Sequence, residues 1–386
     1  MPRRTFLPFA PPAIDDREID AVVETLRSGW LTTGPRVRAL ETAFAAAVRA
    51  PEALAVASGT HALHLALLAL GIGAGDEVIV PTITFCSTAH VVEHVGATPV
   101  IVDIDPQTLC LDPAAVEAAC SPRTRAMIAV HLYGHPCPMD ELDAIATRRS
   151  LAVVEDAAHA FPAAAHGLPV GRGHHLTAFS LYATKNITSA EGGILTGPPD
   201  LLARARPLAL HGMSRDAYRR YDADGSWRYD VHDAGLKCNM SDVHAAIGLA
   251  QLAKVETLQA RRRAVVRRYT EALQGIPELE CPVERPTVTS AWHIYALRLR
   301  EEQLRIDRDG FIEALRARQI GSSVHFIPLH RLSYYRDRYA LAPDQFPAAE
   351  REWTRLVSLP LHPTLSDADV EDVIAAVLDI VREARR

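Results

Sequence analysis

The stretch "TRAMIAVHLY" (residues 124–133), continued by "MDELDAIATRRS" (139–150) and "LAVVEDAA" (151–158), decides the fold class of this chain. The first and third segments are apolar runs of the kind found in strands buried on both faces, and the middle segment has the mixed composition of a surface helix. A strand, a helix and a second strand in succession form a βαβ unit with parallel strands. The predicted fold class is therefore α/β.

The same alternation extends outward from this unit. Two more apolar runs, "DEVIVP" (76–81) and "TPVIVDID" (98–105), precede it, and each strand candidate has a helix candidate before it: "GTHALHLALLALGI" (59–72), "STAHVVEHVG" (87–96) and "DPAAVEAAC" (112–120). Residues 55–200 therefore predict a mostly parallel central sheet flanked by helices.

The character of the sequence changes at residue 240. The segment "MSDVHAAIGLAQLAKVETLQARRRAVVRRYTEALQ" (240–274) predicts one long helix that leads into a smaller C-terminal domain. In that domain we expect a strand with alternating exposure in 291–300, a capped helix in 307–319, a strand in "IGSSVHF" (320–326) and a capped terminal helix in 366–386. These expectations divide the chain into a large domain at 1–250, which includes the N-terminal segment, and a small α+β domain at 251–386.

Composition excludes several classes of protein. The formal net charge of −6 and a pI of about 6.3 provide no basic excess for a nucleic acid or an anionic membrane. No run of 18 apolar residues predicts a membrane span. The N-terminal "PRRTFLPFAPPAIDDREID" (2–20) resembles a twin-arginine signal, but prolines and acids interrupt its apolar stretch, so we expect no export. Six cysteines without CxxC spacing indicate reduced thiols and a cytoplasmic protein.

Three strand-end features point to chemistry. The strand "TAFSLYAT" (177–184) is followed directly by Lys185, one of only three lysines, and a lysine amine can lose its proton and attack a carbonyl. Asp156 ends a predicted buried strand, where ligands bind in open α/β sheets. Gly59 and Thr60 begin a helix directly after a strand, and such N–H groups bind anions.

Each feature alone has an ordinary interpretation: a solvated lysine, an acidic helix cap after a strand, and a Ser/Thr helix cap. Together they supply the three parts that a pyridoxal 5'-phosphate (PLP) enzyme requires, which are a phosphate site, an acid for the pyridine nitrogen and an amine for the cofactor aldehyde.

The chain also resembles the DegT/DnrJ/EryC1/StrS family of PLP-dependent sugar aminotransferases, within the aspartate aminotransferase superfamily of fold type I. The resemblance extends over nearly the whole chain and includes "SGTHALHLAL" (58–67), "PTITFCSTAHVVEHVGATPVIVDID" (81–105), "VEDAAHA" (154–160), "FSLYATKNITSAEGG" (179–193), "GLKCNMSDVHAAIGLAQL" (235–252) and "SVHFIPLH" (323–330). It implies that the N-terminal segment belongs to the folded enzyme.

The resemblance also implies residue roles. Lys185 would join covalently to PLP and act as the catalytic base, and Asp156 would face the pyridine nitrogen. Gly59, Thr60 and Ser180 would bind the cofactor through backbone and hydroxyl groups. Phe85 would supply an aromatic ring, and His159 stands where many relatives have glutamine. Asn239 would reach the neighbouring subunit of a homodimer.

For the substrate, the resemblance implies an NDP-keto-sugar, in particular an NDP-4-keto-6-deoxyhexose, with L-glutamate as amino donor. His325, His330 and His211 are guesses for the sugar pocket, and each could equally be structural. Two other readings stay open: another keto substrate such as a keto-cyclitol, or a non-catalytic regulatory protein with this fold.

Two histidine patterns suggest metal sites, and we expect neither to bind one. "HVVEH" (90–94) matches the H-x-x-E-H zinc pattern, but no third ligand is evident and the segment fits the outer part of a helix. "HLYGHPC" (131–137) offers two histidines and a cysteine at a strand exit without a partner pair.

Overall fold

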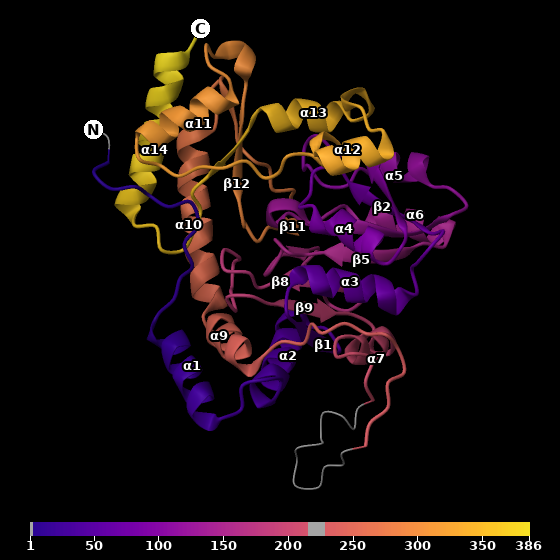
Figure 1. Ribbon diagram of the computed structural model, residues 1–386. Coiled ribbons are helices and arrows are strands. Elements are labelled where there is room, and N and C mark those ends of the chain that lie inside the picture. The colour runs from indigo at the N-terminus through magenta and orange to yellow at the C-terminus, as the bar shows by residue number, and fades with distance from the viewer. Residues whose placement is uncertain (1–2, 215–227) are drawn as a thin grey trace.

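The computed structural model describes residues 3–214 and 228–386, and its main feature is a seven-stranded sheet (Figure 1). The strand order is β1-β9-β8-β5-β4-β2-β3. Strands β2, β3, β4, β5 and β8 pair in parallel, and both pairs that involve β9 are antiparallel. The strands are β1 (Ala53–Val56), β2 (Glu77–Pro81), β3 (Thr98–Val102), β4 (Thr124–Val130), β5 (Ala152–Asp156), β8 (Leu176–Ser180) and β9 (Gly193–Thr196). The predicted α/β class with a mostly parallel sheet is confirmed.

Helices cover both faces of this sheet. One face packs against α3 (Gly59–Leu70), α4 (Ser87–His94) and α7 (Pro199–Leu208), and the other packs against α2 (Pro35–Val48), α5 (Pro113–Ala119) and α6 (Met139–Arg149). Successive strand residues are buried on opposite faces of the sheet. Val154 packs on the face covered by α3, α4 and α7, and Val153 packs on the face covered by α5 and α6. Each fully buried side chain of this kind contributes roughly 1.5–3 kcal/mol, which explains the continuous apolar runs.

The C-terminal part has its own core. A three-stranded antiparallel sheet of β10 (Leu279–Glu280), β12 (Tyr295–Leu299) and β13 (Leu356–Leu359) packs with α10 (Val255–Leu273), α11 (Arg308–Ala317) and α14 (Asp367–Ala384). In Figure 1, α10 runs along the side of the molecule from α9 (Asp242–Ala253) toward α11 and α14. Leu7 also packs in this core, although the predicted boundary assigns it to the large domain. The division at residue 250 stays a prediction.

The remaining elements complete the chain and hold the N-terminal segment in place. They are α1 (Asp16–Ser28), α12 (Ser333–Tyr339), α13 (Pro347–Thr354) and the short hairpin sheet of β6 (Ala164–Ala165), β7 (Leu168–Pro169) and β11 (Val288–Thr289). Asp242 accepts hydrogen bonds from the N–H groups of Gly34 and Val37 at the start of α2. The segment before residue 50 is thus tied to the body of the protein, as predicted.

Three local predictions need correction. The helix predicted over 240–274 is two helices, because Lys254 leaves helical geometry (φ −112°, ψ 10°) while its amine pairs with Asp15 and Glu18. Residues 320–326 form no continuous strand and make only isolated bridges, from Ile320 to Leu7 and from Ser323 to Ser358. β12 is buried throughout rather than on alternate residues.

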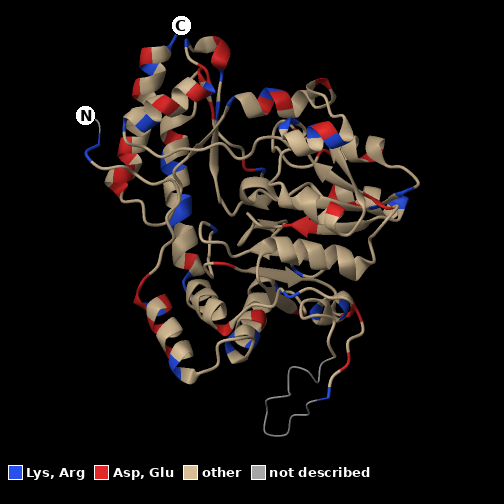
Figure 2. Ribbon diagram, in the orientation of Figure 1, with Lys and Arg blue, Asp and Glu red and all other residues tan. Residues whose placement is uncertain are grey.

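The predicted caps are confirmed: the side chain of Asp307 accepts from Gly310 N–H, and Ser366 forms a capping box with Asp369. Charged residues lie mainly on the outer helices, while the strands of the central sheet carry few charges: Glu77 at the start of β2, Arg125 near the start of β4, and the acidic tip of β5 (Figure 2). Within residues 3–214 and 228–386, no helix is long and apolar enough to cross a membrane.

Candidate active site

A cavity of about 540 Å³ lies where strands β4, β5 and β8 end, and residues from distant parts of the chain line it. This position is the carboxyl edge of the parallel strands, where ligands bind in open α/β sheets. The structure brings together here eight of the predicted site residues: Gly59, Thr60, Phe85, Asp156, His159, Ser180, Lys185 and His325.

The two acids at the end of β5 have different surroundings because successive strand residues point to opposite faces. Asp156 lines the cavity, whereas the Glu155 carboxylate is 2.9 Å from His131 Nε2 and 2.9 Å from Thr177 Oγ1. Burial by itself would raise the pKa of Glu155, but the interactions with His131, His175 and Thr177 together outweigh burial and lower that pKa. Glu155 is therefore a structural partner of His131.

Asp156 is buried, and its carboxylate lines the cavity, where it can bind a cationic ligand. Its carboxylate accepts hydrogen bonds from Thr88 Oγ1 (2.7 Å) and from Ala158 N–H (3.1 Å). Burial raises the pKa of Asp156, while these bonds and the charge of Lys185 act in the opposite direction. A buried carboxylate of this kind is stabilised by an opposite charge beside it. A protonated pyridine nitrogen would supply that charge, so this end of the cavity fits the ring of PLP.

Lys185 follows β8 and lines the same cavity. Burial lowers the pKa of its amine to about 8, although the charge of Asp156 raises it. An amine with this pKa is partly deprotonated near neutral pH, and only the deprotonated form attacks an aldehyde or accepts a proton. The position and acidity of Lys185 therefore suit covalent attachment and proton transfer.

The start of α3 forms an anion site at the cavity wall. Ser58 caps the helix by accepting from His61 N–H, and in the described part of the chain the N–H groups of Gly59 and Thr60 have no protein acceptor. Helix N-termini with free N–H groups bind phosphates. A Cβ on Gly193 of the neighbouring strand would lie 2.4 Å from the Ser58 carbonyl, so glycine is required there. The cradle fits the phosphate of PLP.

Three histidines line the cavity, and burial lowers the pKa of each one: His159, His293 and His325. For His325 the pKa falls to about 4, so these rings are neutral at physiological pH. His159 Nδ1 accepts the N–H of Tyr133 at 3.3 Å, which leaves its proton on Nε2. His159 therefore offers a hydrogen-bond donor without a charge.

Two further predicted residues complete the lining. Phe85 exposes 55% of its surface although it is aromatic, and its ring centre lies 5.7 Å from that of Phe326. An exposed ring at a cavity is available to stack on a planar ligand. Ser180 Oγ accepts Tyr182 N–H at 3.3 Å, and its own hydroxyl proton is free to be donated.

Three predicted residues lie outside the cavity lining. Asn239 donates to Thr33 Oγ1 at 2.7 Å and lines a separate hollow next to α2 and α7. His211 is exposed on the surface, and residues 215–227, which follow it closely in the chain, lie outside the described residues. His330 is 1% exposed, with ring nitrogens 2.7 Å from Thr82 Oγ1 and 2.6 Å from Glu350 Oε1. Both ring nitrogens of His330 are therefore engaged within the protein, and its contact with substrate stays a guess.

Sequence reasoning missed the residues that support Asp156 and Lys185. Thr88 is one of them, and its place four residues after Thr84 at the start of a helix could have suggested a polar pair. Asn186 Nδ2 donates to Ala291 O at 2.7 Å, and its Oδ1 lies 3.1 Å from His293 Nδ1. No local signal connects His293 to Lys185, because more than a hundred residues separate them.

Both suspected metal patterns have structural partners. Glu93 of "HVVEH" accepts hydrogen bonds from Tyr334 (2.5 Å) and Tyr339 (3.0 Å). In "HLYGHPC", His131 pairs with Glu155, and the Cys137 thiol donates to a backbone carbonyl.

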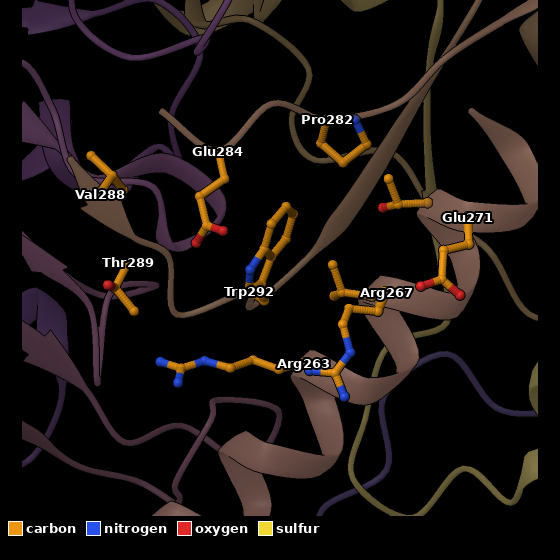
Figure 3. A pocket seen from close by; sticks show the side chains of 10 residues that line it. Arg263, Arg267, Glu271, Pro282, Glu284, Val288, Thr289 and Trp292 are labelled. Carbon is orange, nitrogen blue, oxygen red and sulfur yellow. The ribbon is translucent and has the colours of Figure 1, made fainter. Parts of the chain in front are cut away.

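A second cavity, of about 570 Å³, lies between α10 and the segment before β12, and Trp292 forms part of its wall (Figure 3). Arg263 and Arg267 of α10 border it, and it contains none of the predicted site residues. Trp292 and His293 are consecutive residues, and they line the second and the first cavity, respectively.

A parallel sheet with an amine, an acid and a phosphate cradle around one cavity is typical of PLP-dependent enzymes. Comparison with known proteins agrees. A sequence profile of the DegT/DnrJ/EryC1/StrS aminotransferase family matches residues 12–378. The spore coat polysaccharide biosynthesis protein SpsC of Bacillus subtilis is 47% identical over 384 residues, which are 99% of each chain.

Solved structures show the same similarity. The putative sugar aminotransferase Spr1654 from Streptococcus pneumoniae, in its PMP form, has 35% identity and a TM-score of 0.92, over 98% of this chain and 99% of that one; its PLP form has a TM-score of 0.91. DesV of S. venezuelae, in complex with a ketimine intermediate, has 35% identity and a TM-score of 0.88, over 97% and 98%.

The chain belongs to the DegT/DnrJ/EryC1/StrS aminotransferase family. It is a PLP-dependent aminotransferase, and its cofactor is pyridoxal 5'-phosphate. The family and the cofactor recognised in the sequence are thereby confirmed.

Proposed function

We propose that the enzyme aminates an NDP-keto-sugar, in particular an NDP-4-keto-6-deoxyhexose, with L-glutamate as the amino donor. The observation that carries the proposal is the cavity in which the Lys185 amine, with its lowered pKa, lies among the same wall residues as the buried Asp156. The similarity to a putative sugar aminotransferase and to a polysaccharide biosynthesis protein supports a sugar as the acceptor.

The chain's own residues have distinct proposed tasks. Lys185 Nζ would hold the cofactor through a bond to its aldehyde carbon, with loss of water, and once free would accept and return a proton as the catalytic base. Asp156 holds positive charge at the ring nitrogen, and the N–H groups of Gly59 and Thr60, with the Ser180 hydroxyl, hold the phosphate. PLP, when bound, carries the amino group between the two substrates and withdraws electrons from the bond that breaks.

Two side chains position the ring in this proposal. Phe85 would stack on the ring, and the neutral His159 would donate from Nε2 to the ring oxygen. The pKa of His159 falls well below its usual range, so it donates this bond without adding a charge beside the Lys185 amine. A neutral donor here avoids repulsion that would lower the affinity for the protonated cofactor ring.

We further infer a homodimer with a shared active site. Among the described residues that line the cavity, Lys185 is the only lysine or arginine, yet L-glutamate carries two carboxylates and a nucleoside diphosphate is multiply anionic. Additional cations must therefore come from outside this lining. Asn239, which lies away from the cavity of its own chain, is proposed to contact the phosphate in the neighbouring subunit. His325 is proposed to face the sugar, and His211 stays a guess.

The proposed location is the cytoplasm. All six cysteines are free thiols, as is usual in reducing compartments. Nucleotide sugars as substrates are consistent with the same compartment.

The test begins with the purified, PLP-loaded enzyme. L-Glutamate should convert the yellow form to the pyridoxamine form with loss of visible absorbance, and D-glutamate is the control. The pyridoxamine form is then offered NDP-4-keto-6-deoxyhexoses, NDP-3-keto-sugars and keto-cyclitols, and recovery of the absorbance identifies the acceptor. An unchanged spectrum with L-glutamate would refute the donor. Recovery with a keto-cyclitol alone would refute the sugar, and no turnover with any pair would favour a regulatory role.

A further inference from the structure

Asp143 on α6 meets two consecutive histidines, His174 and His175, from the loop before β8. One ligand atom from each residue lies within 4.8 Å of the other two. His175 Nε2 is 2.8 Å from Asp143 Oδ1, and the two imidazole centres are 4.7 Å apart. In residues 3–214 and 228–386, this is the only group of three or more His, Cys, Asp or Glu side chains with ligand atoms so close together.

An ordinary ion pair accounts for only part of this arrangement. One turn earlier on α6, Asp140 pairs with a single histidine, His166, at 3.4 Å. At Asp143 a second histidine is present, and within the described chain His174 contacts the ring of His175 but makes no hydrogen bond and no ion pair. His174 is exposed and lines a surface hollow of about 330 Å³, which gives a ligand access from solvent.

The donor set indicates which ion would fit. Two imidazole nitrogens and one carboxylate oxygen are ligands for Zn²⁺ and similar transition-metal ions, whereas Ca²⁺ and Mg²⁺ prefer oxygen ligands alone. Zn²⁺ bonds to nitrogen and oxygen at about 2.0–2.2 Å, so adjacent ligand atoms are closer than 4.8 Å in a formed site. The ligand atoms must therefore come closer together to hold the ion, and His174 is the exposed member of the three.

We propose that Asp143, His174 and His175 form a binding site for one divalent transition-metal ion of the Zn²⁺ type. The ion takes the position of the hydrogen bond between His175 and Asp143, and the Nε2 proton of His175 moves to solvent or to Nδ1 as the metal bond forms. Three protein ligands leave at least one position for water. The ion links α6 to the loop before β8 and thereby ties two segments of the fold together.

This site is separate from the amino-transfer cavity. His174 and His175 precede β8, whereas Ser180 and Lys185 lie at its other end and beyond it. None of the three proposed ligands lines the cavity of about 540 Å³. Metal binding and amino transfer can therefore succeed or fail independently.

The experiment uses the full-length, untagged, PLP-loaded enzyme, because a polyhistidine tag would itself bind Zn²⁺. After treatment with EDTA and removal of the chelator, ZnCl₂ is titrated by calorimetry, and the thermal unfolding midpoint is recorded with and without Zn²⁺. His174→Ala is the main variant, since His174 has no other hydrogen bond to lose. His166→Ala is the matched control, because its histidine pairs with an aspartate of the same helix without a third ligand.

The expected result is one tight Zn²⁺ per chain in the unchanged protein and in His166→Ala, with a rise in the unfolding midpoint. His174→Ala and Asp143→Asn should each weaken this binding at least about tenfold and abolish the rise. Equal binding by His174→Ala and the unchanged protein, or no site with one ion per chain, would overturn the proposal. Amino-transfer activity of each variant shows that it is folded.

Discussion

Lys185 and Lys254 are both enclosed lysines, but their surroundings differ. Lys254 Nζ lies 2.9 Å from Asp15 Oδ2 and 2.7 Å from Glu18 Oε1, and these pairs hold α1 to the junction of α9 and α10. Lys185 faces one acid, Asp156, and burial outweighs that charge, so its pKa falls to about 8. The comparison teaches that the balance between burial and nearby carboxylates decides whether a lysine is a structural cation or a reactive amine.

The largest effect is expected from Lys185→Arg. Arginine keeps a charge but has no amine that can lose its proton, so activity should fall at least about a thousandfold, since a positioned general base alone contributes about 10²–10⁴-fold. The measurement is kcat/KM with the best donor and acceptor, together with the visible spectrum. Lys254→Arg is the matched control and should stay active. Full activity in Lys185→Arg would break the comparison.

Asp156→Asn should have the next largest effect. The variant keeps the shape of the side chain but removes the charge that would face the ring nitrogen, and we expect kcat to fall by about 10²–10³-fold. Asp140→Asn, which changes an exposed aspartate on α6, is the control and should not alter kcat. If Asp156→Asn had the activity of its control, the acid would have no role in the chemistry.

Lys254→Met tests the structural side of the comparison. Removal of the amine leaves Glu18 buried without its cation, and breaking a buried pair in this way costs about 3–5 kcal/mol of unfolding free energy. Denaturant unfolding of the holoenzyme measures this change, while kcat per folded molecule should stay the same. An unchanged unfolding midpoint would show that the Lys254 pairs contribute nothing to stability.

The smallest effect concerns pH. In the protein stripped of PLP, covalent reconstitution should speed up with pH and level off above about pH 8, because that is the pKa of Lys185. In Asp156→Asn the half-point should move lower, since the charge of Asp156 raises this pKa. A half-point near 10.5, the ordinary lysine value, would mean that burial does not tune the amine.

The same shift has a consequence for stability. An unfolded lysine keeps its proton up to about pH 10.5, whereas the folded Lys185 loses it near pH 8. Between these values the unfolded chain binds more protons, so the contribution of Lys185 to the stability of the PLP-free protein becomes more favourable as the pH rises.

Much of the fold could be predicted from local patterns. The apolar runs at β2, β3, β4 and β5 predicted parallel strands because burial on both faces demands apolar residues at every position. The helix predicted over 240–274 failed in its middle, because the partners of Lys254 lie near residue 15 and exert no influence on the local pattern. The strand predicted over 320–326 does not form, because Ile320 bridges to Leu7 whereas Ser323 bridges to Ser358, so no single strand pairs along the whole segment.

The candidate site divides in the same way. Lys185, Asp156, Gly59 and Thr60 were predicted because each follows a recognisable strand or begins a helix, and the structure brings all four to one cavity. His330 could not be distinguished from His325 by sequence, since both belong to "SVHFIPLH" and only packing encloses one of them.

The sequence by itself determined the α/β class, the strand ends that carry chemistry and the family, because these depend on short apolar periods and on residues in fixed order. Only the tertiary structure decided that Thr88 supports Asp156, that burial lowers the pKa of Lys185, and that Asp143 meets His174 and His175. The reason is physical: burial and charge depend on groups from distant parts of the chain, and their proximity exists only after folding.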